Sequence, residues 1–286
     1  MSGILGLKID VDTYQGMRDG VPCLLEILRR SGLPATFYLS IGPDASGRAV
    51  LQLLRNPRFL KKMIRTRAAS LYGFRTALYG TLLPSPMIAL SFPEIVRRIK
   101  AEGHEVQFHA WDHRRWQDEL FTKSESWIRE WFKRGIAGFE RLVGEKPQSF
   151  GAPAWLIDDR VLSIVGGLGF EYLSCTRARA PFIHEGINLV EIPSDIPCFE
   201  EVGMAEGTQK ILSALAEGGM HVLPVHAEVE GGIMADNFIA LIEAIKKMDY
   251  RFVRLGEMIS LLNRTELPTR RFRLELLPGR SVACAV

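Results

Sequence analysis

Two histidines four residues apart, His109 and His113, end the stretch Gly-His-Glu-Val-Gln-Phe-His-Ala-Trp-Asp-His at positions 103–113. The alternation of apolar and polar residues before His109 predicts a half-buried strand at 105–110 that runs out into a turn. If the chain after His109 coils through a helical turn, both imidazoles lie on one face and can bind the same metal ion. Two ligands do not make a site, so further ligands must come from elsewhere in the chain.

Two carboxylates, Asp10 and Asp12, form an Asp-x-Asp pattern at the end of an apolar run that begins at Ile4. The run is typical of a strand. One carboxylate can bind a metal ion while its neighbour handles a proton. With Asp12 as the ligand, His109 and His113 complete a set of one oxygen and two nitrogens, which leaves positions open for water and substrate.

An ion in such a site lowers the pKa of a bound water and polarises a carbonyl group. Asp10 is then the predicted general base. Cleavage of an amide also needs an acid that protonates the leaving nitrogen, and His226, which follows the apolar run 222–225, is placed for that role. His184 and His221 are interpreted as ordinary satisfied polar groups. Zinc suits the ligand set best, but manganese, cobalt and nickel also fit it.

The composition is that of one large domain. The chain has 286 residues, of which 47% are hydrophobic and 24% charged, enough apolar material for a single core. Its four cysteines lie far apart without a C-x-x-C pair, which indicates neither a thiolate zinc site nor a disulfide framework. The first residues lack a basic segment followed by an apolar one, so no secretory signal is predicted. A reducing cytoplasm is the expected location, and nucleic acid is not an expected partner.

An acid-free segment separates Asp44 from Glu94 and carries eight basic residues, although the whole chain has a net charge of only +3. Apolar residues recur at helical spacing at 59–64, and the uncharged run 76–93 is broken by prolines and glycine, so a spanning helix is not predicted. A basic amphipathic helix followed by an apolar loop is typical of an element on an anionic membrane surface. The alternative is an ordinary insertion with a solvated basic face. The candidate contacts to a lipid phosphate or membrane are Arg58, Lys61, Lys62, Arg65, Arg67 and Tyr72.

Strand and helix patterns alternate along the chain. A strand at 4–11, a helix at 22–32 and a strand at 36–42 predict a parallel βαβ unit. Further strands are expected at 105–110, 148–152, 170–175, 189–193, 221–226 and 250–254, and further helices at 92–102, 124–143, 159–165, 208–216, 237–248 and 255–263.

Seven or eight such strands in one domain favour a distorted (β/α) barrel over a doubly wound sheet. The candidate site residues support this choice, because they fall at the carboxyl ends of predicted strands, where barrels carry their chemistry. We expect one domain at 1–267, including a membrane-facing insertion at 45–93. Residues 268–286 are interpreted as a C-terminal tail, a mobile or docking extension.

These motifs resemble the NodB-type polysaccharide deacetylase superfamily, metal-dependent amide hydrolases on a distorted (β/α)7 barrel. The resemblance implies a base at Asp10 and a metal-binding carboxylate at Asp12. The H-x-x-x-H motif matches His109 and His113, which implies the remaining ligands. The last motif implies the acid at His226.

The third motif of the superfamily usually begins with an arginine that orients the base, whereas the matching stretch at 151–155 reads Gly-Ala-Pro-Ala-Trp. The orienting contact for Asp10 therefore has no counterpart there. The backbone N–H near Ala154 can still act as the oxyanion donor, because that role needs no side chain. The superfamily often pairs its acid histidine with an aspartate, which makes Asp195 a candidate partner of His226.

Longer motifs narrow the resemblance to the 4-deoxy-4-formamido-L-arabinose-phosphoundecaprenol deformylases. They lie at 7–13, 20–28, 41–44, 68–73, 109–113 and 226–231. The resemblance implies removal of a formyl group from a sugar on undecaprenyl phosphate, at the cytoplasmic face of the inner membrane, in lipid A modification and polymyxin resistance. The basic segment would then hold the polyprenyl phosphate and dock on the bilayer. Within these motifs Trp111, Glu228 and Glu230 are candidates for substrate contacts.

Two other functions stay open. One keeps the chemistry and replaces the substrate by an N-acetylated glycan or glycolipid, although the missing export signal argues against a cell-wall polymer. The other is a non-catalytic scaffold that binds a lipid phosphate, against which the intact set of candidate site residues argues. The sequence makes no prediction about oligomeric state.

Overall fold

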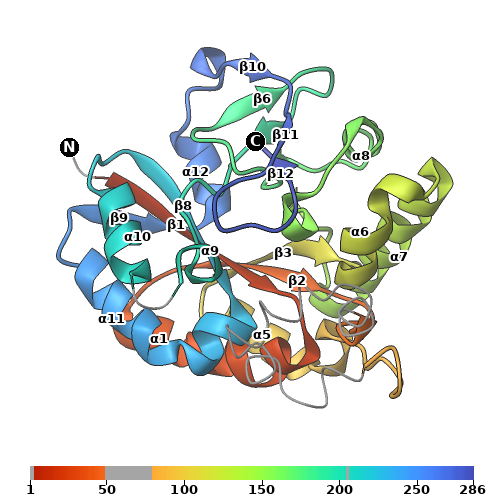
Figure 1. Cartoon of the computed structure of the whole chain (residues 1–286), viewed down its shortest axis with the longest axis horizontal. Coiled ribbons are helices and arrows are strands. Elements are labelled where there is room, and N and C mark those ends of the chain that lie inside the picture. Colours follow the sequence, from red (N-terminus) through yellow and green to blue (C-terminus); the bar gives the residue numbers. More distant parts are fainter. Residues whose placement is uncertain (1–2, 49–78, 204–205) are drawn as a thin grey trace.

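The computed structural model describes residues 3–48, 79–203 and 206–286. Its centre is a mostly parallel sheet with the strand order β10-β6-β7-β5-β4-β3-β2-β1-β8, and β9 also pairs with β1 (Figure 1). The strands are β1 (Gly3–Val11), β2 (Thr36–Ser40), β3 (Glu105–Ala110), β4 (Ser149–Phe150), β5 (Tyr172–Leu173), β6 (Phe182–His184), β7 (Val190–Glu191), β8 (Met220–His226), β9 (Tyr250–Val253) and β10 (Thr269–Arg270). Within the described residues, the strand path ends at β8 and β10, which do not pair with each other, so the sheet does not close into a full barrel. The expected distorted (β/α) barrel is confirmed in the form of an α/β half-barrel.

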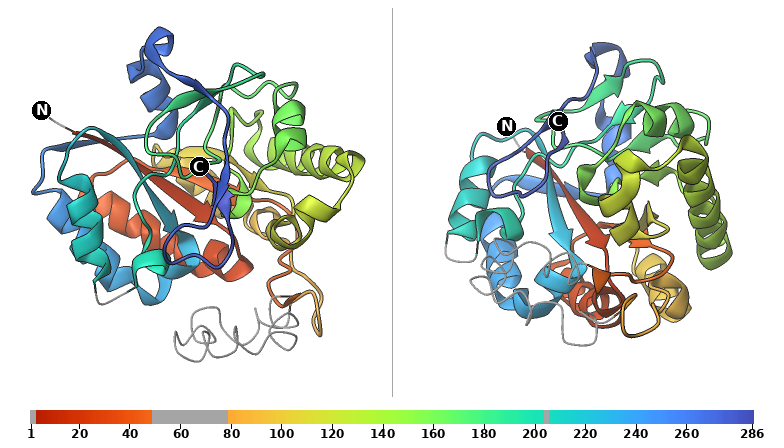
Figure 2. Two further views of the ribbon diagram at one scale, coloured as in Figure 1. Left: turned by 45° about the horizontal axis from the view of Figure 1, so that its top comes forward. Right: turned by 45° about the vertical axis from the view of Figure 1, so that its right-hand side comes forward.

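Helices surround this sheet, as both views of Figure 2 show. They are α1 (Val21–Ser31), α5 (Pro93–Ala101), α6 (His113–Glu119), α7 (Glu125–Val143), α8 (Asp159–Val165), α9 (Phe199–Val202), α10 (Gly207–Leu215), α11 (Ala235–Ile245) and α12 (Leu255–Leu261). The helices predicted within the described residues are confirmed to within a few residues. The predicted basic amphipathic helix around 59–64 lies outside the described residues. The sequence patterns did not predict α6, α9, β6 or β10.

Strand β1 lies between β2 and β8, next to one end of the strand path. Its side chains at Leu5, Leu7, Ile9 and Val11 are fully buried. A parallel strand covered on both faces is expected to be apolar throughout, and this burial gives the end of β1 a rigid support. The carboxyl ends of β1, β3 and β8 meet at one edge of the sheet because these strands are parallel.

Aromatic side chains fix α6 and α7 against β3 and β4. The rings of Trp116 and Trp131 lie 4.3 Å apart, and Phe132 and Phe150 lie 4.9 Å apart at an angle of 75°. Pairs of this kind contribute about 0.5–1.5 kcal/mol each beyond their buried area. The indole Nε1 of Trp116 also donates to the carbonyl of Leu156 at 2.9 Å. The first turn of α6 is therefore held firmly beside the end of β3.

The C-terminal residues pack on the domain and do not form a mobile extension. β10 pairs with β6, and β11 (Leu274–Glu275) pairs with β12 (Cys284–Ala285), whose two residues are fully buried. The N–H of Arg177 donates to the carbonyl of Ala285 at 2.7 Å. Residues 268–286 were expected to be a mobile or docking extension, and these contacts favour the docking alternative.

The predicted insertion at 45–93 is described only at its two ends. Residues 49–78, which include all six candidate lipid contacts, lie outside the described residues. Of the described ends, Arg48 pairs with Glu119 at 2.7 Å and Pro43 bridges to Met87. Among the helices that the structure describes, none has the length and apolar character needed to cross a membrane.

Candidate active site

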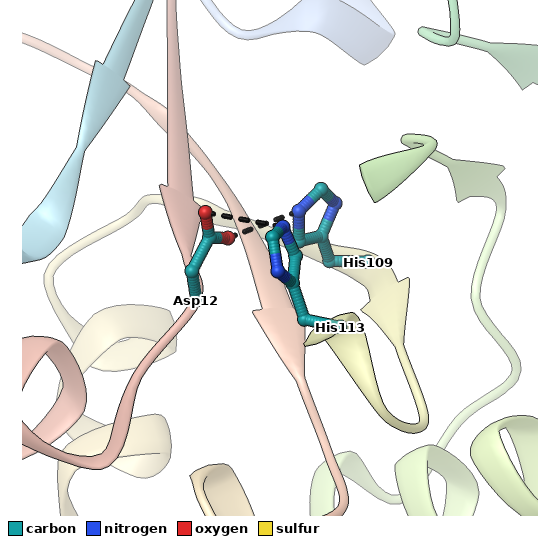
Figure 3. Close-up of side chains that lie close together, drawn as sticks. All are labelled: Asp12, His109 and His113. Atoms are coloured by element: carbon teal, nitrogen blue, oxygen red, sulfur yellow. Dashed lines mark ion pairs between the residues drawn. The ribbon is translucent and has the colours of Figure 1, made fainter. Parts of the chain in front are cut away.

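Asp12, His109 and His113 come together at the edge of the sheet, as Figure 3 shows. Asp12 follows β1, His109 lies in β3 and His113 is the first residue of α6. The Nε2 atoms of His109 and His113 lie 3.0 and 3.2 Å from the two carboxylate oxygens of Asp12. The two imidazole rings are 5.2 Å apart. The structure thus places the three predicted ligands around one point.

A strand-to-helix turn, and not a helical turn, brings the two histidines onto one side. Asp112 is extended, with φ −137°, and its side chain accepts a hydrogen bond from the N–H of Arg115 at 2.9 Å as the cap of α6. The cap ends the strand and starts the helix within three residues. The expected convergence holds, but its expected geometry was wrong.

The protonation of the two imidazoles suits metal ligands. Nδ1 of His109 lies 2.7 Å from the carbonyl oxygen of Gly151. A carbonyl only accepts, so Nδ1 carries the hydrogen. In the neutral imidazole that a metal ligand requires, Nε2 then presents its lone pair to Asp12. Burial lowers the pKa of His113 to about 4, although Asp12 beside it works in the opposite direction. His113 is therefore a neutral imidazole at neutral pH.

This arrangement leaves two acceptors facing each other. Oδ1 of Asp12 and Nε2 of His109 are buried and have no hydrogen-bond partner, yet they lie only 3.0 Å apart. Two lone pairs at that distance repel each other unless a cation lies between them. One oxygen and two imidazole nitrogens are also ligands that a divalent transition metal prefers. The residues therefore fit a metal ion.

A second group of possible ligands consists of Cys198, Glu200 and His226. Burial keeps the pKa of the Cys198 thiol well above its ordinary value, which opposes formation of the thiolate that a metal needs. His226 is also the predicted acid. The group around Asp12 is accordingly the better metal centre among the residues described.

Asp10 lies two residues before Asp12 on β1 and is 3% exposed. In the register of the parallel pair it is level with His226 at the end of β8. The predicted base and acid therefore come from neighbouring strands beside the metal group. Lys8, which the sequence reasoning missed, contacts both carboxylate oxygens of Asp10.

His226 is set up to hold a proton. Burial opposes its charge, but the carboxylates of Glu200, Asp12 and Glu230 outweigh burial and raise its pKa to about 9. Its Nδ1 lies 3.7 Å from an Oε2 of Glu200. At neutral pH the imidazole is therefore protonated and can act as an acid.

Asp195 is not the partner of His226, and that prediction was wrong. Its carboxylate accepts hydrogen bonds from Nδ1 of His221 at 2.6 Å and from the N–H of Val222 at 2.8 Å. These residues lie near the start of β8, whereas His226 ends it, and five residues of strand span about 16 Å. Glu200, in α9, is instead the carboxylate that pairs with Nδ1 of His226.

The three candidates for substrate contacts differ in position. Glu230 is 1% exposed, and its Oε2 accepts a hydrogen bond from the backbone N–H of His226 at 2.7 Å. Glu230 therefore holds the backbone of His226 in place. Glu228 is also buried, which keeps its pKa well above the ordinary value. Trp111 is half-buried, and a Cβ at Gly42 would lie 2.1 Å from its carbonyl oxygen. The glycine at position 42 therefore lets the backbone of Trp111 approach closely.

The turn at Pro153–Trp155 is strained. Ala154 and Trp155 have φ values of 53° and 54°, in the region that residues with a side chain rarely adopt. Arg280 holds this turn by donating to the carbonyl of Ala154 at 3.0 Å, and its guanidinium lies 4.8 Å from the Trp155 ring centre. The N–H groups of Trp155 and Leu156 donate to carbonyls within the turn, and Pro153 has none. The N–H of Ala154 is therefore the candidate oxyanion donor in this turn.

Neutralising Glu200 is expected to move the alkaline limb of the activity profile. The proton on His226 is lost as the pH rises through its pKa of about 9, and Glu200 is the carboxylate that raises this pKa most. In Glu200→Gln the pKa of His226 falls, so activity should decline at a lower pH than in the wild type. The measurement is kcat against pH. Glu257→Gln on α12, where Glu257 pairs with Arg254, is the control and should leave the profile in place. An unmoved limb in Glu200→Gln would contradict the assignment of the acid.

Comparison with known proteins agrees with this geometry. The polysaccharide deacetylase family model matches residues 9–173. A Shewanella sediminis (strain HAW-EB3) protein named "Probable 4-deoxy-4-formamido-L-arabinose-phosphoundecaprenol deformylase ArnD" is 35% identical over 261 residues, which cover 89% of this chain and 85% of that protein. A Wigglesworthia glossinidia brevipalpis protein with the same name is 27% identical and covers 93% of this chain and 96% of its own.

The fold has a counterpart in a crystal structure from Mycobacterium smegmatis that carries the polysaccharide deacetylase name. It superposes with a TM-score of 0.66 at 21% identity and covers 96% of each chain. The family match extends over more than half of the chain, and one relative exceeds 30% identity over most of it. The chain therefore belongs to the polysaccharide deacetylase family, and the protein is an amide hydrolase.

Proposed function

We propose that the protein removes the N-formyl group from 4-deoxy-4-formamido-L-arabinose on undecaprenyl phosphate and releases formate, in lipid A modification and polymyxin resistance. The observation that carries the reaction class is the meeting of Asp10, His226 and the Asp12, His109 and His113 group at one edge of the sheet. The formyl substrate is supported by the name of the relative that is 35% identical.

Asp12, His109 and His113 would hold one divalent ion, most suitably zinc, with manganese, cobalt and nickel as the other candidates. When bound, the ion supplies Lewis-acid polarisation of the amide carbonyl and lowers the pKa of a water. Its ligand atoms are those that face each other in the structure.

The protein residues carry the proton transfers. The carboxylate of Asp10 accepts a proton from the attacking water, so that the water oxygen can bond to the formyl carbon. The N–H of Ala154 donates to the former carbonyl oxygen as negative charge develops there. The His226 imidazolium then gives its proton to the substrate nitrogen, the C–N bond breaks, and formate and the free amine leave.

The basic segment would bind the lipid phosphate and an anionic membrane surface through Arg58, Lys61, Lys62, Arg65, Arg67 and Tyr72. In support, described residues on both sides of positions 49–78 lie close to the active site. Asp44 accepts a hydrogen bond from the N–H of Tyr14 at 2.8 Å, and the rings of Tyr14 and Tyr79 lie 6.0 Å apart. Tyr14 is two residues after Asp12. We therefore place the enzyme on the cytoplasmic face of the inner membrane, attached peripherally.

A matched pair of substrates tests the proposal. Purified, metal-loaded enzyme is offered the same polyprenyl-phosphate pentose with either an N-formyl or an N-acetyl group, and formate, acetate and free amine are measured. One methyl group in an acyl pocket is worth about 10–200-fold in kcat/KM, so formate release should be faster by that factor. The free sugar without the lipid is the control for the basic segment.

The other outcomes separate the alternatives. Faster release of acetate would make the protein a deacetylase of an N-acetylated glycan or glycolipid. Binding of the lipid-linked sugar without release of either acid would favour a non-catalytic scaffold. Equal rates with the free sugar would remove the lipid role of the basic segment.

A further inference from the structure

We propose that Lys8 is the positioning residue for the general base, holding the Asp10 carboxylate in the orientation from which it takes the proton of the attacking water. The inference rests on the proposed function, because it requires Asp10 to be the base. The stretch 151–155 has no cationic side chain to offer Asp10, and the structure supplies one from β1 itself.

The contact is short and involves both oxygens. Nζ of Lys8 lies 2.6 Å from Oδ1 and 2.5 Å from Oδ2 of Asp10. Residues two apart on a strand point to the same face, so the pair forms within β1 without any loop. Hydrogen bonds between charged groups are the strongest of their class, and engaging both oxygens fixes the rotation of the carboxylate.

The Lys8–Asp10 pair is almost completely buried. Lys8 is 0% and Asp10 3% exposed. The ammonium lies 4.8 Å from the ring centre of Tyr38 and 5.6 Å from that of Trp155. Aromatic faces at these distances partly offset the loss of hydration of the ammonium. Trp155 also belongs to the strained turn that carries the candidate oxyanion donor, so its ring connects Lys8 to that turn.

Burial of this pair is hard to explain by stability. Two charges removed from water lose their hydration, and replacing a buried ion pair by apolar residues of similar volume is often neutral or stabilising. Lys8 is fully buried on its own face of β1, and Leu7 and Ile9 are fully buried on the opposite face. A lysine is therefore expected here for what it does to Asp10 and not for the stability of β1.

The geometry leaves the base free to act. An ionised carboxylate accepts about four hydrogen bonds, and Lys8 uses one on each oxygen. The remaining lone pairs lie in the carboxylate plane that Lys8 fixes. Misplacement of a reacting group by about 1 Å is enough to lower a rate by about 100-fold. Loss of Lys8 should thus lower kcat without removing a group that contacts substrate.

The first test compares Lys8→Met and Lys8→Arg in the metal-loaded full-length enzyme with the formamido substrate. We expect Lys8→Met to lower kcat by about 100-fold with little change in KM or in the amount of bound metal. Lys8→Arg, which restores a cation and two donors, should recover most of that loss. Lys100→Met on α5, where Lys100 pairs with Glu145, is the control for removal of a lysine charge and should retain wild-type kcat.

Two results would overturn the proposal. One is wild-type kcat in Lys8→Met. The other is a loss of kcat that is accompanied by an equal loss of bound metal and is not recovered by arginine, because that pattern indicates a merely structural role.

A second measurement does not depend on turnover. Thermal unfolding of Lys8→Met, Asp10→Asn and the double variant forms a double-mutant cycle. Asp10→Asn alone leaves a buried ammonium without its anion and should lower the Tm most, and adding Lys8→Met should restore it. Additive shifts in Tm would show that the two residues do not interact and would overturn the proposal. If the wild type releases no acid, the proposed function fails, whereas this cycle still decides whether Lys8 and Asp10 are paired.

Discussion

Asp10→Asn is expected to abolish measurable turnover while one metal ion stays bound. The amide cannot accept the proton of the attacking water, and general-base catalysis is worth about 100–10,000-fold. The metal group is intact in this variant because Asp12, His109 and His113 are unchanged. The measurement combines acid release with metal analysis of the same protein sample.

The control for Asp10→Asn must account for Lys8, whose ammonium loses its anion in this variant. The double variant Lys8→Met, Asp10→Asn removes both charges and should be folded, metal-loaded and equally inactive. If either variant kept near wild-type turnover, Asp10 would not be the base.

His109→Ala is expected to lose both the metal and turnover. His109 supplies one of three ligand atoms, and loss of even an outer partner of a ligand costs about 10–100-fold in metal affinity, so loss of the ligand should cost at least that. Metal content after dialysis and acid release are measured together. His221→Gln is the matched control, because His221 pairs with Asp195 outside the metal group. A His109→Ala protein that binds one ion as tightly as the wild type would show that the ion is held elsewhere.

The strands that carry the site could be predicted because their patterns are local. β1 and β8 are mostly apolar runs that carry Asp10 and His226 near their carboxyl ends, and β3 alternates up to His109. Parallel pairing then brings the carboxyl ends together without further information. This is why the candidate base, acid and metal ligands could be placed at one edge from the sequence alone.

The partners of these residues could not be predicted, because they depend on loops that return from far along the chain. Asp195 and Glu200 are both acids ahead of β8, and only the path of the chain decides that Glu200 reaches His226 while Asp195 reaches His221. Likewise Arg280 reaches the turn at Ala154 across 126 positions of sequence.

The contact of Lys8 with Asp10, in contrast, has a local signal in the sequence. A lysine within an otherwise buried strand needs an anion, and the acid two residues later lies on the same face. The contact between Lys8 and Asp10 can therefore be predicted from the sequence. The strands β5 and β7 fall within the predicted ranges 170–175 and 189–193, but β6 spans only three residues, too few to show a period, and its position follows only from the sheet.

The most direct test of the central claim is release of formate and free amine from the lipid-linked formamido sugar before and after removal of metal by a chelator. We expect the stripped enzyme to be inactive, about one equivalent of zinc per chain to restore turnover, and formate and amine to appear in equal amounts. Turnover that persists in fully stripped protein, or zinc that restores binding but no formate, would contradict the central claim.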